Sequence, residues 1–141
     1  MKFDLRVLSP LSIHEAGGSY ACNQLALALE RATRSTDEIR GTHALQMCVF
    51  ARNPMDPLSQ EDLPDLIFTL QVALLDEDNQ AIPIPSLNQE WLHGQFYLDK
   101  TGRARLHLKG LDEDCEAENV DLLIPQVVEE ILFLLGVHPD V

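Results

Sequence analysis

The chain has 141 residues, of which 45% are hydrophobic and 23% are charged, which is typical of a single soluble globular domain over residues 1–141. Ten basic and 23 acidic residues give a formal net charge of −13. Such a surface repels phosphate groups and disfavours direct nucleic-acid binding. The apolar runs are too short for a membrane span, so we expect no membrane insertion.

The compartment is inferred from the cysteines and the first residues. Cys22, Cys48 and Cys115 are odd in number and have no paired spacing, which favours reduced thiols. The N-terminal residues lack the long apolar region of a secretion signal. We therefore expect a cytoplasmic protein.

The N-terminal half predicts two strands and a helix. Residues 2–8 alternate apolar and polar side chains, as a strand does. Residues 11–16 are interpreted as irregular. A helix is predicted from near Ser19 to Thr33, because its apolar residues share one face and serine suits a helix start. A second strand is predicted over residues 44–51, and a proline-rich loop over 53–64.

The centre of the chain predicts two hairpins. Residues 66–75 alternate as a strand, and residues 81–84 follow a polar turn as a short edge strand. A helical interpretation of residues 63–75 stays open, although β-branched and aromatic residues favour the strand. In the second hairpin, residues 96–98 and 103–109 flank a four-residue turn that ends in Gly102.

The C-terminal part predicts an acidic linker over residues 111–118 and an extended stretch over 120–124. Pro125 suits the first turn of a last helix, and Gly136 suits its end. The fold class is therefore α+β. We expect an antiparallel sheet of two hairpins plus the N-terminal strands, packed by one helix from the N-terminal half and one C-terminal helix.

The last helix is apolar over most of its circumference. Phe133 falls on the same stripe as the polar residues Glu129 and Glu130, where a lone globular domain would place a polar side chain. We therefore expect self-association, as a homodimer, or a tight protein partner on the face around Phe133 and Leu122.

A second candidate surface is aromatic. Trp91, Phe96 and Tyr97 lie near a proline-limited strand in an acidic chain, a composition typical of protein-binding surfaces. The alternative is that Trp91 covers the core.

The loop around residues 12–19 is the weaker candidate. His14 and Glu15 could act as an acid–base pair, and Gly17, Gly18 and Ser19 before a helix could hold a phosphate. The loop lacks the lysine and spacing of a phosphate-binding loop, so a capped turn is the simpler interpretation.

No catalytic residue, metal site or cofactor is predicted, because no motif with the required spacing occurs. The first functional hypothesis is a non-enzymatic acidic protein-binding module, of the adaptor, chaperone or immunity-protein kind. Its expected partner is a protein, and the acidic surface suits a basic one. The alternatives are a small enzyme or ligand-binding protein that uses the 12–19 loop, and an acidic nucleic-acid mimic.

Overall fold

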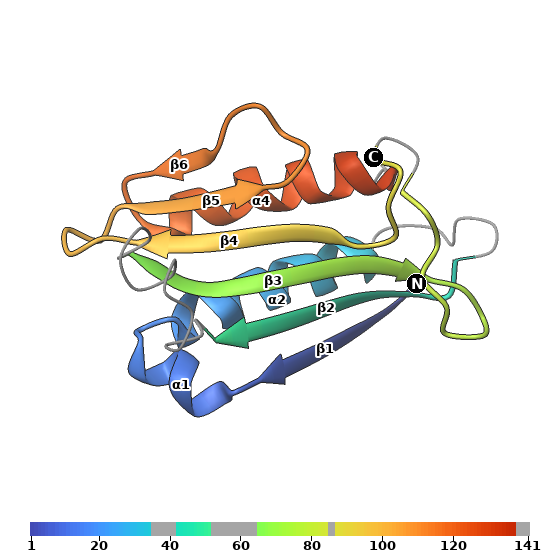
Figure 1. The fold of residues 1–141 in the computed structure, drawn as a ribbon, viewed down its shortest axis with the longest axis horizontal. Coiled ribbons are helices and arrows are strands. Elements are labelled where there is room, and N and C mark those ends of the chain that lie inside the picture. Colours follow the sequence, from blue (N-terminus) through green and yellow to red (C-terminus); the bar gives the residue numbers. More distant parts are fainter. Residues whose placement is uncertain (35–41, 52–64, 85–86, 138–141) are drawn as a thin grey trace.

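The computed structural model describes residues 1–34, 42–51, 65–84 and 87–137. Within these residues a six-stranded sheet forms one layer, and helices on one of its faces form a second (Figure 1). The elements follow in the order β1 (Lys2–Leu8), α1 (Pro10–Glu15), α2 (Ser19–Arg34), β2 (Ala44–Ala51), β3 (Leu66–Leu75), β4 (Leu92–Leu98), β5 (Ala104–Leu108), β6 (Cys115–Ala117) and α4 (Val120–Leu135).

The sheet is mixed, which corrects the expected antiparallel arrangement. Its strand order follows the sequence from β1 to β6. β1 and β2 are parallel, and the other neighbours are antiparallel. The reason is the connection: α1 and α2 lie between β1 and β2, and α2 returns the chain along the sheet, so that β2 starts at the same end as β1. The first stretch after β1, expected to be irregular, contains α1.

The strand interpretation of residues 66–75 is confirmed, and the helical alternative is wrong. Leu66, Phe68, Leu70 and Val72 are at most 5% exposed. The expected partner strand over residues 81–84 is not present. That stretch makes only isolated bridges, from Leu75 to Ala81 and from Ile84 to Gln89, and β3 pairs with β4 instead. Proline in the stretch removes a ladder donor, which explains why no strand extends through it.

The second predicted hairpin is confirmed as β4 and β5. Asp99 closes its turn by accepting hydrogen bonds from the N–H groups of Thr101 at 2.9 Å and Arg103 at 3.0 Å. A further hydrogen bond from the Thr101 hydroxyl, at 2.6 Å, is the main cause that lowers the pKa of Asp99. Gly102 has a φ of 89°, the left-handed conformation that glycine adopts without strain.

The start of the last helix corrects two expectations. α4 begins at Val120 rather than at Pro125, so residues 120–124 are helical and not extended. Asn119 caps it, since its side chain accepts the Leu122 N–H at 2.9 Å. The expected end is confirmed, because Gly136 is left-handed with a φ of 76°. The expected linker before α4 contains the short strand β6.

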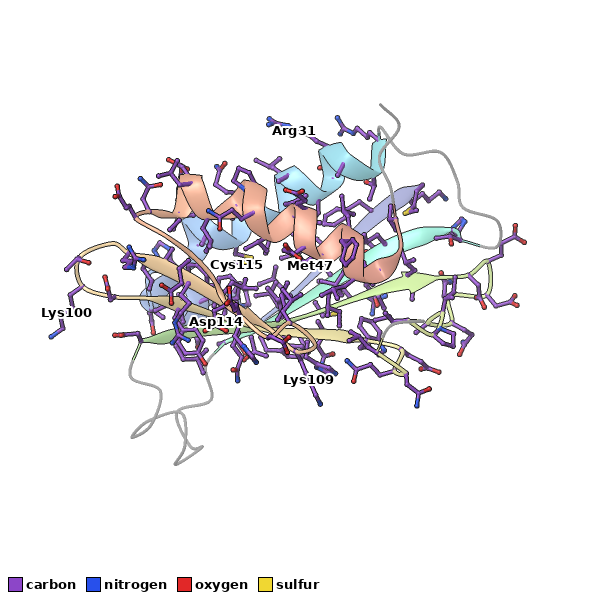
Figure 2. The ribbon with its side chains drawn as sticks, turned by 90° about the horizontal axis from the view of Figure 1, so that it is seen from above. Arg31, Met47, Lys100, Lys109, Asp114 and Cys115 are labelled. Atoms are coloured by element: carbon purple, nitrogen blue, oxygen red, sulfur yellow. The ribbon has the colours of Figure 1, made fainter. Side chains whose placement is uncertain are left out.

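The main core lies between the sheet and the two long helices. Figure 2 shows Met47 between the layers, Arg31 on the outer side of the helices and Lys109 on the open face of the sheet. Leu45, Met47 and Val49 of β2 are fully buried, as their alternation predicted. Among the described helices, none combines the length and apolar character needed to cross a membrane. The predicted loop over residues 53–64 lies outside the described residues.

Candidate protein-binding surface

The outer face of α4 carries two of the most exposed large apolar side chains in the described chain. Phe133 is 68% exposed and Leu122 is 54% exposed. Their spacing of eleven residues equals about three helical turns, so both lie on one side of the helix, about 16 Å apart along its axis. Gln126 and Glu129 lie between them and are also exposed. We call these four residues the α4 outer stripe.

An acidic hollow lies beside this stripe. It is lined by the β5–β6 loop and by the outer side of α4, and its volume is about 330 Å³. The lining residues are Leu111, Asp112, Glu113, Asp114, Cys115, Gln126, Glu129 and Glu130. Gln126 and Glu129 belong to both the hollow and the stripe, so apolar and acidic groups meet on one continuous surface.

The negative field of the hollow acts on a neighbouring thiol. Burial raises the pKa of Cys115, and the charges of Glu130 and Asp114 raise it further. The carboxylate charges that disfavour the thiolate favour a cation, such as a lysine or arginine side chain. Within the described residues, no group of three or more His, Cys, Asp or Glu side chains is arranged to hold a metal ion.

A contact with α2 fixes the start of α4. The Tyr20 hydroxyl of α2 donates a hydrogen bond to Asp121 of α4 at 2.5 Å. This hydrogen bond raises the pKa of Tyr20. Leu122 therefore follows a residue that is tied to the neighbouring helix, which holds the beginning of the stripe in place.

Trp91, Phe96 and Tyr97, which were predicted to form one aromatic surface, do not lie together on one surface. Phe96 is 1% exposed and stacks on Phe68 with ring centroids 4.8 Å apart, inside the main core. Tyr97 follows it in the same strand and therefore points to the opposite face of the sheet. Trp91 is half-buried against a small cluster of Ala44, Ala73, Leu75 and Ala81, which agrees with the alternative that it covers a core.

The predicted 12–19 loop is mostly helical, because residues 12–15 belong to α1 and Ser19 begins α2. Only residues 16–18 form the tight turn between the two helices. His14 Nδ1 lies 3.2 Å from the Ser19 hydroxyl, and both His14 and Glu15 are exposed. Gly17 is left-handed with a φ of 82°. Gly18 is buried, and a Cβ there would lie 2.6 Å from a methyl group of Ile67, so packing against the sheet accounts for this glycine. The acidic hollow lies elsewhere, between the β5–β6 loop and α4.

A polar cluster on the open face of the sheet was not predicted. Asp114 accepts a hydrogen bond from Arg105 Nη1 at 2.6 Å and lies 2.7 Å from His107 Nδ1. The Arg105 guanidinium lies 4.0 Å from the centre of the Tyr97 ring, and the Tyr97 hydroxyl donates to Gln95 at 3.0 Å. The alternation of Arg105 and His107 on one strand face was the available signal, since two basic groups side by side favour an acid nearby.

Asp114 is expected to make the free energy of unfolding depend on pH. Burial alone would raise the pKa of Asp114, but hydrogen bonds from Arg105 and His107 outweigh it and hold the pKa below its ordinary value. Stability from such a group is fully present above the unfolded pKa of about 3.9 and is lost as the pH falls through the lower folded value. We expect Asp114→Asn to cost about 1 kcal/mol near pH 7.

Urea unfolding of both proteins from pH 7 to pH 2 checks this prediction. The stability difference between the wild type and Asp114→Asn should be largest above about pH 5 and should narrow toward pH 2. A difference that grows as the pH falls would contradict the assigned direction of the pKa shift.

The three cysteines are unpaired, with Cys22 and Cys115 buried and Cys48 half-buried.

The chain matches no known protein family, no curated protein and no solved structure.

Proposed function

We propose that this chain is a non-enzymatic protein-binding module whose α4 outer stripe and acidic hollow hold an amphipathic segment with apolar and basic residues. One observation carries the proposal: Phe133, 68% exposed, lies in line with Leu122 on a helix face that also lines an acidic hollow. Exposed aromatic side chains of this kind are typical binding anchors. The unpaired cysteines support action in a reducing, cytoplasmic compartment.

The spacing of the stripe suits a helical partner. Two apolar anchors about 16 Å apart match residues three turns apart on a second helix. Basic residues on the flank of that helix would enter the hollow, where Glu129 and Glu130 meet the acidic β5–β6 loop. The overall charge of −13 would speed the encounter with such a partner.

A second copy of this chain fits this face less well. A symmetric contact through the stripe would bring Glu129 and Glu130 toward the same residues of the other copy. Like charges placed together at an interface oppose binding. The basic partner is therefore the occupant that the charge of this surface favours.

The test uses a fluorescent amphipathic peptide of leucine and lysine, with a matched peptide of leucine and glutamate. We expect the lysine peptide to bind the wild type. Phe133→Glu should weaken that binding at least about tenfold, because it removes an aromatic anchor that the bound peptide would cover. The substitution adds a negative charge, which by itself favours a basic peptide. A loss of binding therefore reports the apolar contact.

Leu11→Glu is the matched control. Leu11 is 69% exposed in α1, and its replacement adds the same charge at a different place. Equal peptide binding by Phe133→Glu and Leu11→Glu would contradict the proposed surface. Equal binding of the lysine and glutamate peptides by the wild type would contradict the proposed partner chemistry.

A further inference from the structure

The edge strand β1 is open on one side. Figure 1 shows β1 along the border of the sheet, next to β2, and among the described strands only β2 pairs with it. The opposite border is the three-residue strand β6, so β1 is the longer open edge. An unpaired strand edge is a template for a further strand.

The backbone of β1 offers hydrogen-bonding groups outward at every second residue. The Lys2 N–H donates to the His43 carbonyl at 3.2 Å, on the β2 side. Because these groups alternate along a strand, those of Phe3, Leu5 and Val7 face outward. The side chains of the same three residues lie on the helix side of the sheet, in register with the buried face of β2.

Apolar surface accompanies this edge. Leu5 is 37% exposed and Leu27 of α2 is 44% exposed. Both line a groove of about 500 Å³ between β1 and α2, whose other lining residues are Phe3, Ala26 and the polar residues Asn23 and Glu30. Leu8, at the end of the strand, is 50% exposed. The edge therefore combines free backbone groups with exposed apolar side chains beside them.

We propose that β1 pairs with β1 of a second copy of this chain, antiparallel and about a two-fold axis at Leu5, to form one continuous sheet. The sequence of the strand is self-complementary in this register. Phe3 lies opposite Val7 of the other copy, Leu5 opposite Leu5, and Asp4 opposite Arg6. The outward-facing residues then form the hydrogen-bonded pairs, as antiparallel geometry requires.

The charges select this register over its neighbours. Only even shifts keep the outward backbone groups paired. A shift of two residues in one direction sets Asp4 opposite Asp4, and in the other direction it sets Arg6 opposite Arg6. Charged residues on an edge strand normally keep edges apart, whereas here each meets its opposite across the axis. In the isolated chain Arg6 Nε lies 3.4 Å from Asp4 of the same strand, and the side chains are 67% exposed for Arg6 and 46% exposed for Asp4.

The test is a charge exchange followed by sedimentation equilibrium at micromolar concentrations. Arg6→Asp and Asp4→Arg each place like charges opposite each other twice per dimer, so each should raise the dimer dissociation constant at least about tenfold. The double variant restores opposite charges and should recover most of the wild-type affinity. Arg6→Asp is the cleaner single change, because Asp4 also accepts a hydrogen bond from Gln46 at 2.6 Å.

Two further measurements locate the contact and check the fold. The Leu5 amide should exchange slowly with solvent in the wild-type dimer and rapidly in Arg6→Asp. Circular dichroism should show that the variants stay folded. A wild type that is monomeric at high micromolar concentration overturns the proposal. A dimer that survives Arg6→Asp but is lost in Phe133→Glu also overturns it and places the contact on α4.

Discussion

Replacing Phe96 by alanine is expected to lower the free energy of unfolding by about 3–5 kcal/mol. The Phe96 side chain is 1% exposed and stacks on Phe68 between the sheet and the helices. Its removal loses the transfer free energy of an aromatic ring and leaves a cavity that the packed layers cannot fully close. Denaturant unfolding, followed by circular dichroism, measures the change.

Phe133→Ala provides the matched control, since it removes the same ring from an exposed position. Phe133 is 68% exposed, and a surface substitution of this kind usually changes stability by less than about 0.5 kcal/mol. Similar losses in the two variants would contradict the distinction between a core position and a binding position. If Phe96→Ala left the free energy of unfolding unchanged, Phe96 would not be a core residue and would again be a candidate for the binding surface.

The periodic parts of the fold could be predicted from the sequence. The alternation in β3 identified both the strand and the face that packs under the helices. Its other face is mixed, and Ala73 and Leu75 on that face are buried in the small cluster with Trp91. The turn before Gly102 was predictable from local chemistry alone. Both features depend on residues that are close in sequence.

The features that could not be predicted depend on distant parts of the chain. The direction of β1 relative to β2 is set by how α2 crosses the sheet, and no residue in either strand encodes it. The start of α4 was placed too late because Pro125 favours a first helical turn, whereas the Asn119 cap and the packed face of Leu123 and Val127 extend the helix before it. Tertiary packing outweighs the local preference there.

The candidate binding surface also combines a feature that depends on residues close in sequence with one that depends on distant parts of the chain. The exposed position of Phe133 followed from helical periodicity and its polar neighbours. The acidic hollow did not, because it requires the β5–β6 loop to lie against α4. Phe96 and Tyr97 were grouped because they are adjacent in sequence, but adjacent strand residues point to opposite faces.

Leu70→Ala is expected to cost about 2–5 kcal/mol, and part of this cost should be recovered by a second change at Gly94. Leu70 is fully buried in β3, and Gly94 is its partner in β4. A Cβ at Gly94 would lie 3.3 Å from Leu70 Cδ1 and 3.1 Å from Leu108 Cδ2. Leu70 therefore fills the space that the missing Gly94 side chain leaves, and Gly94→Ala alone should overpack the core.

In the double variant, the methyl group of alanine at position 94 would enter the cavity left by the shortened side chain at position 70. The combined loss of stability should therefore be smaller than the sum of the single losses, by about 1 kcal/mol. The recovery should be partial, because the contact with Leu108 and a distance of 3.3 Å to the His107 carbonyl remain. A double-mutant cycle in urea measures this coupling. If the loss of stability of the double variant equals the sum of the two single losses to within about 0.3 kcal/mol, Leu70 and Gly94 do not share one packing space.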